Sequence, residues 1–471
     1  MKKFISIIVT IVQFIFSLIG DFFGALVDAF AKQTGFNAAF GKEHLIASRF
    51  YKGLVVSKHR KLTRKASFSN MLLSAVTGAG KSTRIIIKCL FSLKKCTIIV
   101  NDPSKELFLL TSGYLSKHFT VRTLNFSNSS ISSGYNILSR IKKPNDINKV
   151  AHVLVAASLD KGNSSDPFWS LSVKTLLQIL IRLTLAQAEQ YRNMANVMYL
   201  LHRFAADPAI VDRLIAQSND PQLILEYKSL LSTPEKTLQN IVASAKAALQ
   251  LFDDPEIAKT TAYDSIDFDC LRKEPTVIFL HNTIGDTKYL AVLVSLFFEQ
   301  LYNHVLEQLP GKRDLDLFCI LDEASSLLIP LLPLACANGR KVRLSNLISV
   351  QSKSQLKSFY KDEAENITAN CLTKVYLPGQ TSIDELKEIE TLSGKCVYID
   401  DKKTERVKPL ITIDEIRLLP KNRSLIISGN HPIIKGRTSP YYRSLKYNRF
   451  AKIAPIDLHG DIPTTPVPLL Q

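Results

Sequence analysis

No two of the seven cysteines form a CxxC pair, and most of them lie in apolar runs. This spacing predicts reduced, buried thiols in a protein body that faces the cytoplasm. Acidic residues are also scarce, because 42 of them stand against 60 lysines and arginines, which gives a formal net charge of +18. That imbalance favours a polyanionic partner, either nucleic acid or an anionic membrane surface. The cysteines are Cys89, Cys96, Cys270, Cys319, Cys336, Cys371 and Cys396.

The sequence has no internal repeat, and its 471 residues are 46% apolar and 22% charged. Such a composition excludes a disordered or fibrous chain. The length is enough to bury a sizeable core and predicts two or three domains.

Charge is absent from Phe4 to Gly20, which follows Lys2 and Lys3. As a helix this stretch would reach about 26 Å, slightly less than the hydrocarbon core of a bilayer. We expect residues 1–40 to form a membrane-associated segment that holds the chain at the inner (cytoplasmic) membrane. A buried helix or a cleaved signal peptide is the alternative.

Residues 41–65 carry eight basic side chains against one acidic residue, Glu43. A linker lying near anionic lipid headgroups and a nucleic-acid-facing segment both fit this composition, and the sequence does not separate them.

Six short apolar runs follow, separated by longer segments of helical pattern. Continuous apolar runs are typical of strands buried on both faces, so we expect an α/β domain with a parallel sheet. Residues 187–262 show helical periodicity and almost no strand pattern, which predicts an all-α insertion that divides the α/β domain into 41–186 and 263–453. The Pro/Thr-rich tail, 454–471, is expected to be flexible. The runs are MLLSAV, CTIIVN, PTVIFLHN, LFCILD, LSNLISVQ and CLTKVYLP.

The stretch SAVTGAGKSTR, which follows the first run, fits a relaxed P-loop pattern with Ala75 in the position where glycine is commoner. Small residues let the loop wrap so that backbone amides and the next helix N-terminus point at a phosphate. Lys81 is expected to reach the β- and γ-phosphates of ATP, and Ser82 to bind Mg²⁺. The nucleotide-binding residues predicted in this way are Thr77, Gly78, Ala79, Gly80, Lys81, Ser82 and Thr83.

A P-loop needs a second strand that ends in acids, and LFCIL followed by Asp322 and Glu323 supplies one. We expect Asp322 to hold the Mg²⁺ shell and Glu323 to polarise the attacking water. An ordinary strand end is the alternative interpretation.

Two further residues follow from the same logic. Gln351 ends the next apolar run, so it could sense the γ-phosphate or place the water if that strand lies beside the Asp-Glu strand. Arg340 precedes it by eleven residues and could reach a neighbouring subunit's nucleotide as an arginine finger. The alternatives are a polar strand cap and a surface arginine.

From about Asn70 to Tyr442 the chain resembles the TraG/TraD-type coupling ATPases of type IV secretion and conjugation. Beside the P-loop and LDEASSL, the resemblance rests on the order and spacing of several short motifs. They are NDPSKEL, GYNIL, DPFW, LQLFDDPEIAK, GRK with VQSKSQL, TIDEIRLLP and SGNHPIIKGRTSPYY.

The resemblance implies a RecA-like P-loop NTPase with an all-α insertion, anchored in a membrane and assembled as a homo-hexamer. Such a motor hydrolyses ATP with Mg²⁺ and drives DNA, single- or double-stranded and without sequence specificity, towards a type IV secretion channel. Its partners are a relaxase or relaxosome and the channel proteins. Two other functions fit the sequence: a coupling ATPase that exports proteins, and a nucleotide-gated cargo receptor that hydrolyses little.

Overall fold

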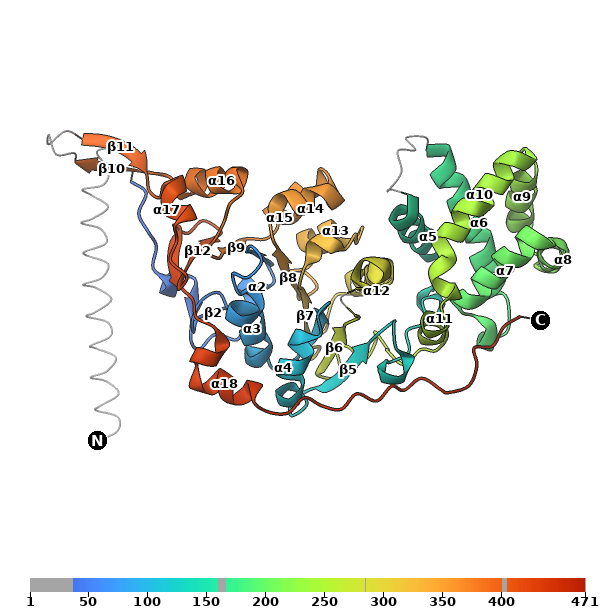
Figure 1. Cartoon of the computed structure of the whole chain (residues 1–471), viewed down its shortest axis with the longest axis horizontal. Coiled ribbons are helices and arrows are strands. Elements are labelled where there is room, and N and C mark those ends of the chain that lie inside the picture. Colours follow the sequence, from blue (N-terminus) through green and yellow to red (C-terminus); the bar gives the residue numbers. More distant parts are fainter. Residues whose placement is uncertain (1–36, 160–166, 284, 400–404, 471) are drawn as a thin grey trace.

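A nine-stranded sheet forms the centre of the molecule in the computed structural model, which describes residues 37–159, 167–283, 285–399 and 405–470 (Figure 1). The strand order is β13-β12-β9-β3-β8-β7-β4-β6-β5, and neighbours from β9 to β5 are parallel. The strands are β3 (Met71–Ser74), β4 (Cys96–Asn101), β5 (Thr120–Leu124), β6 (Thr276–Leu280), β7 (Asp316–Leu321), β8 (Leu344–Val350), β9 (Thr373–Tyr376), β12 (Arg423–Ser428) and β13 (Ile434–Arg437).

The six runs predicted as strands are the six inner strands, β9 to β6, so the expected parallel sheet is confirmed. Both faces of these strands are buried. Leu72 belongs to one apolar core, whereas its neighbours Met71 and Leu73 belong to the core on the opposite face. Strands β12 and β13 add antiparallel pairing at one edge.

Helices cover the sheet, and two small hairpins lie beside it (Figure 1). The hairpins pair β1 (Ala47–Ser48) with β2 (Lys61–Leu62), and β10 (Lys395–Ile399) with β11 (Glu405–Pro409). The helices are α2 (Arg64–Ser67), α3 (Ile87–Ser92), α4 (Glu106–Leu115), α12 (Thr287–Glu307), α13 (Leu332–Asn338), α14 (Lys353–Tyr360), α15 (Glu363–Ala369), α16 (Ile383–Ser393), α17 (Ile413–Arg417) and α18 (Leu445–Ala451).

Between β5 and β6 every described regular element is a helix, and these helices form a separate block at one end of the molecule (Figure 1). Two of them start at an Asp-Pro pair: Asp220 and Asp254 each accept two backbone N–H bonds at the first turn, where proline needs no partner. The domain limits proposed from the sequence stay a prediction. The helical block contains α5 (Pro144–Leu159), α6 (Pro167–Leu185), α7 (Met194–Ala206), α8 (Ala209–Gln217), α9 (Pro221–Leu231), α10 (Glu235–Leu249) and α11 (Pro255–Ala262).

Two described helices, α6 and α12, are long and apolar enough to cross a membrane by length and composition. Both contribute to the core of the body, with 44% of the α6 window and 67% of the α12 window buried. The predicted membrane segment, 1–40, lies almost wholly outside the described residues.

The cysteines correct one expectation. All seven are free thiols, and five are buried, but Cys270 is exposed and Cys396 is only half-buried. Cys270 lies in an irregular segment between α11 and β6. Because this segment is not a strand of the sheet, the thiol of Cys270 is not buried as a strand residue would be.

Residues 454–470 of the tail, here called the strap, run along the body from α18 to the helical block (Figure 1). Their expected flexibility stays a prediction. The strap is held along its length: the Gly460 amide donates to the Ser130 carbonyl at 2.8 Å, and Asp461 pairs with Arg122 at 3.1 Å. At its end, the buried Asn196 side chain donates to the Pro468 carbonyl at 2.9 Å and accepts from the Leu470 amide at 2.8 Å.

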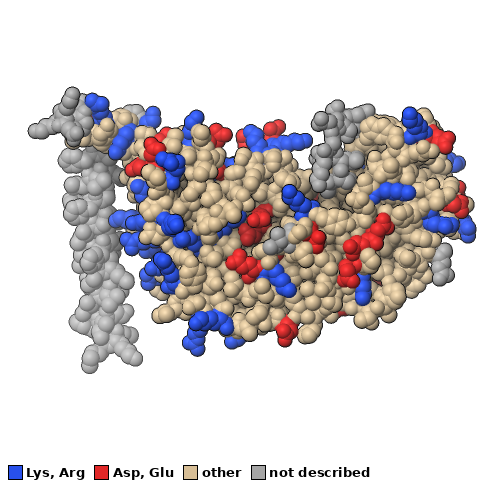
Figure 2. All heavy atoms as spheres, viewed as in Figure 1, with Lys and Arg blue, Asp and Glu red and all other residues tan. Residues whose placement is uncertain are grey.

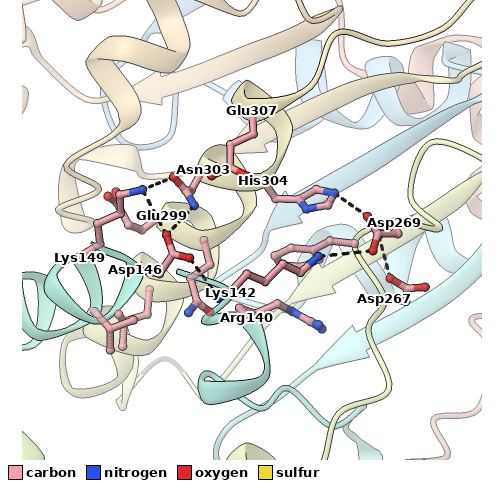
Figure 3. Close-up of a pocket in the computed structure, with 14 residues that line it drawn as sticks. Arg140, Lys142, Asp146, Lys149, Asp267, Asp269, Glu299, Asn303, His304 and Glu307 are labelled. Atoms are coloured by element: carbon pink, nitrogen blue, oxygen red, sulfur yellow. Dashed lines mark hydrogen bonds and ion pairs between the residues drawn. The ribbon is translucent and has the colours of Figure 1, made fainter. Parts of the chain in front are cut away.

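The helical block meets the α/β part at a cleft between α5, the 267–269 segment and α12, here called the joint cleft (Figure 3). Its charged groups largely pair with one another. Lys149 and Asp146 lie 3.4 Å apart, and Asp269 pairs with His304 at 3.5 Å and with Lys142 at 3.6 Å. We therefore regard the cleft as a packed joint between the two parts.

Glu299 is an exception in the joint cleft, because it is 4% exposed and, among the described residues, its carboxylate accepts a bond from the Leu331 amide alone, at 2.8 Å. Burial raises the pKa of Glu299 to about 7, although the Leu331 bond and Lys149 oppose the shift. The folded chain thus holds a proton that the unfolded chain releases near pH 4.5.

The stability that Glu299 contributes is full below about pH 4 and is lost as the pH rises through 7. We expect Glu299→Gln, which keeps the oxygen that accepts from Leu331, to be more stable than wild type at pH 8 by up to about 3 kcal/mol. The difference should vanish at pH 4. Urea unfolding at the two pH values measures it, and Glu307→Gln on the exposed face of α12 is the control. An equal difference at both pH values would contradict the assignment.

Gly113 of α4 gives a test of the strap, because a Cβ atom there would lie 1.9 Å from the Ala454 carbonyl oxygen. Alanine is favoured over glycine within a helix, so Gly113→Ala leaves α4 intact and pushes the strap away. We expect proteases to cut residues 454–463 several-fold faster in this variant, as measured by limited proteolysis with mass spectrometry. The control Leu109→Ala changes an exposed position of α4, and proteases should cut it at the same rate as wild type. Unchanged cleavage of Gly113→Ala would show that the strap does not depend on this contact.

Candidate functional site

The carboxyl ends of parallel strands meet at one edge of a sheet, which is where open α/β sheets bind ligands. Strand β8 lies between β3 and β7, so three loops that follow these strands lie side by side at this edge. They carry the glycine-rich turn after β3, Gln351 after β8, and Asp322 with Glu323 after β7. The expected position of the Gln351 strand beside the Asp-Glu strand is thus confirmed.

The turn after β3 contains two glycines with positive φ angles. Gly78 has φ +80° and Gly80 has φ +85°, a conformation that side chains rarely adopt. A Cβ at Gly80 would also approach the Thr83 hydroxyl to 2.9 Å. The Ala79 amide closes the turn on the Val76 carbonyl at 3.1 Å, and Thr77 is exposed at its tip. A π-helical turn over Ser82–Ile86 then leads into α3.

Lys81 follows this turn, and its Nζ is buried with no hydrogen-bond partner among the described residues. A buried ammonium without a partner is costly unless a ligand supplies the acceptor. The Lys81 Nζ and the free amides at the start of a helix are the groups that hold a phosphate. The turn therefore fits a nucleotide phosphate.

Asp322 lies against the turn. It is 9% exposed, and its Oδ2 accepts from the Ser82 hydroxyl at 3.4 Å, whereas its Oδ1 has no partner in the described part of the chain. Burial raises the pKa of Asp322, and the Lys81 charge and the Ser82 bond oppose this shift. The Asn101 side chain fixes the backbone here by donating to the Asp322 carbonyl at 2.8 Å.

Asp102, which follows the last residue of β4, is a second buried carboxylate at this edge. It is 1% exposed and accepts from the Phe108 amide at 2.7 Å, while its Oδ1 is unpartnered in the described structure. Burial raises the pKa of Asp102 to about 7, and the Asp322 charge adds to the shift.

Carboxylate and hydroxyl oxygens suit a hard cation such as Mg²⁺, which is usually bound by one or two carboxylates together with substrate phosphates. No three His, Cys, Asp or Glu side chains gather as a metal cage in the described residues. Ser82, Asp322 and Asp102 therefore fit a cation that arrives with a nucleotide.

Glu323 has φ +61° and ψ +48°, the left-handed region that non-glycine residues rarely occupy. Its side chain is exposed at the sheet edge, beside the buried Asp322. Such strained backbone clusters at functional sites, where the surrounding structure holds it.

Sequence reasoning missed two residues that hold these loops. Arg84 bonds the Ala79 carbonyl at 3.0 Å and the Thr438 hydroxyl at 3.4 Å, and the GKSTR motif gave no reason to single it out. Glu385 of α16 is 2% exposed and accepts from the Ser74 hydroxyl at 3.2 Å and from the Lys353 amide at 3.0 Å.

Through these two bonds, Glu385 connects Ser74, the last residue of β3, to Lys353, the first residue of α14. Lys353 lies two positions after Gln351. Burial raises the pKa of Glu385, and the two bonds oppose the shift. It is 311 residues from Ser74, so no local pattern could have revealed the contact. Gln351 itself is half-buried and accepts from the Gln355 amide group at 3.4 Å.

Arg340 does not join the site of its own chain. It is exposed and lies between α13 and the first residue of β8, whereas the turn lies at the other end of that strand. The seven residues of β8 separate the two ends by about 23 Å.

The comparisons with known proteins agree with this geometry. Residues 31–456 match the family described as Type IV secretory system Conjugative DNA transfer. The chain is 22% identical over 455 residues to the conjugal transfer protein TraG of Escherichia coli, which covers 83% of this chain and 70% of TraG.

Two solved structures have a similar fold. The bacterial conjugative coupling protein TrwBdeltaN70 in complex with sulphate superposes with a TM-score of 0.67 at 18% identity, covering 90% of this chain and 95% of that chain. Plasmid coupling protein TrwB in complex with ADP and Mg²⁺ gives a TM-score of 0.63 at 20% identity, over 88% of this chain and 91% of that chain. The chain has the RecA-like NTPase fold and belongs to the type IV secretory system family of conjugative DNA transfer, the coupling proteins.

Proposed function

We propose that the chain hydrolyses ATP and uses the energy to deliver DNA, or a protein joined to DNA, to a type IV secretion channel. The observation that carries this proposal is the Ser82–Asp322 contact beside the unpartnered Lys81 ammonium, in a member of a DNA-transfer family. These groups are costly to bury without a ligand, and Mg²⁺ with a nucleotide supplies what each of them needs.

The turn and Lys81 bind the phosphates. Backbone amides of the turn and of the following helix start, apart from the Ala79 amide that closes the turn, donate to phosphate oxygens. The Lys81 ammonium reaches the β- and γ-phosphates. The Ser82 hydroxyl and the Asp322 carboxylate would hold Mg²⁺, and the charge of the nearby Asp102 carboxylate would favour the cation. Bound Mg²⁺ neutralises charge that develops on the phosphates during transfer.

Glu323 and Gln351 act on the water and the γ-phosphate. The Glu323 carboxylate is exposed and accepts the proton of the attacking water. Gln351 senses the γ-phosphate, and Glu385 supports this role because it ties the start of α14 to the strand before the turn.

Arg340 acts in a neighbouring subunit, because the length of β8 keeps it from its own turn. A homo-hexameric ring would place each Arg340 at the next subunit's nucleotide. The net charge of +18 favours DNA contact through phosphates, without base recognition, in such a ring. Residues 1–40 would hold the ring at the inner membrane, where it meets a relaxase or relaxosome and the channel proteins.

Lys81→Ala and Glu323→Gln should separate binding from hydrolysis. Loss of the Lys81 ammonium removes a charged hydrogen bond, so we expect ATP binding to weaken by about tenfold or more, and hydrolysis to be lost. Glu323→Gln should keep ATP binding and slow hydrolysis by about 10²-fold or more. Binding of a fluorescent ATP analogue and phosphate release, with single-stranded DNA present, measure the two effects.

The matched controls are Lys94→Ala and Glu363→Gln, which change exposed residues of the same type away from the turn. Wild-type hydrolysis by Lys81→Ala would refute the proposed motor. Intact DNA transfer by Glu323→Gln would instead favour a nucleotide-gated receptor.

Arg340→Ala should lose hydrolysis alone but regain it when mixed with Lys81→Ala. In a mixed ring, a subunit with an intact turn can lie beside a subunit with an intact arginine. Phosphate release by mixtures of the two purified variants measures the recovery, with Lys341→Ala as the control. The absence of recovery at every mixing ratio would show that Arg340 does not act between subunits.

A further inference from the structure

Two segments far apart in the sequence contain lysine and arginine but no acidic residue. Residues 44–65 hold seven basic and no acidic side chains, and residues 432–452 hold six and none. The fold joins them: the Lys58 amide donates to the Arg437 carbonyl at 2.6 Å, and Glu43 accepts from the Arg437 amide at 2.8 Å. Together they form a surface at the end opposite the helical block, where blue side chains gather at the lower left of Figure 2. We call it the basic end.

Most of this charge is uncompensated. Arg60 pairs with Glu43 at 3.1 Å and Arg64 with Asp316, but the other lysines and arginines of the basic end have no ion pair within the described residues. Like charges lie near one another. Burial lowers the pKa of Lys61, and the charge of Lys446 lowers it further. An anion on this surface would therefore relieve repulsion as well as gain attraction.

Two large apolar side chains stand out from the basic end. Phe50 is 90% exposed between Arg49 and Lys52, and Leu445 is 92% exposed beside Lys446. Both belong to the same end of the molecule: the Phe50 amide donates to the Ser48 hydroxyl at 3.3 Å, Ser48 pairs with Lys61, and the charge of Lys446 acts on Lys61. Exposed apolar groups of this size among cations need a partner that accepts both.

The interface of an anionic bilayer is such a partner. Headgroup phosphates bind the lysines and arginines, while an aromatic ring and a leucine insert at the boundary of the acyl chains. A DNA backbone would engage the charges but would leave Phe50 and Leu445 in water. The sequence also places Phe50 only 30 residues after Gly20, the last residue of the uncharged apolar stretch.

We propose that the basic end docks on an anionic membrane face, with Phe50 and Leu445 inserted among the headgroups. The proposal rests on the membrane attachment proposed above and adds the surface of the NTPase body that makes the contact. It does not depend on ATP hydrolysis.

Tryptophan fluorescence can test this contact in the full chain, because the chain has a single tryptophan, Trp169. Trp169→Phe with Phe50→Trp gives one probe at the proposed contact. The chain is assembled into nanodiscs of phosphatidylcholine with phosphatidylglycerol, or of phosphatidylcholine alone. We expect a blue-shifted emission and quenching by brominated acyl chains in the anionic discs, and much less of both in the neutral discs.

Two further variants sharpen the test. Arg49→Glu with Lys446→Glu should abolish the shift of the Phe50→Trp probe. Leu225→Trp, combined with Trp169→Phe, replaces an apolar residue that is 68% exposed on α9 of the helical block, at the end opposite the basic end, and it should show no shift.

If the protein enters the discs but the emission of the Phe50→Trp probe does not shift, the proposed docking surface is wrong, while membrane attachment stands. An equal shift in neutral and anionic discs would overturn the role of charge. A shift on adding single-stranded DNA, and none with anionic discs, would assign the surface to nucleic acid instead. If the protein does not enter the discs at all, both the proposed membrane attachment and the proposed docking surface are refuted.

Discussion

The site depends on two carboxylates, Asp322 and Asp102, buried at the carboxyl edge of a parallel sheet, with the Lys81 charge near Asp322. Burial raises the pKa of both groups, the Glu323 charge adds to the shift of Asp322, and the Asp322 charge adds to the shift of Asp102. Each carboxylate keeps an oxygen without a partner in the described structure. An apolar replacement would be more favourable for folding alone. The arrangement makes sense when a cation and a nucleotide are bound, because these supply the missing charge and bonds.

The rest of the fold serves to hold this edge. Parallel strands buried on both faces place three loops side by side, and Glu385 and Arg84 pin them from distant parts of the chain. The helical block lies at the end of the sheet opposite β13, and the joint cleft connects it to α12. A movement of the edge loops on nucleotide loss can therefore reach the helical block through packed elements.

The sequence predicted the inner strands well and the edge strands poorly, for a physical reason. Strands β3 and β4 are buried along their whole length and mostly apolar, whereas β5 (TVRTL) and β12 (RSLIIS) carry more polar residues and are partly exposed near the edges of the sheet. The glycine-rich turn and Asp322 are local patterns, so they could be read directly. Glu385 could not, because its contacts come from residues that only the fold brings together, and neither could the bonds of the strap, which run to other segments.

The most direct test of the buried-carboxylate account is the Tm of wild type and of Asp322→Asn, each with and without Mg²⁺ and ADP. Without ligand the account predicts a higher Tm for Asp322→Asn, because the variant removes a buried charge but keeps an acceptor for Ser82. On addition of Mg²⁺ and ADP, the account predicts a large rise in the Tm of wild type and a much smaller rise in the Tm of the variant. A variant that is less stable without ligand, yet gains as much from Mg²⁺ and ADP, would contradict the account.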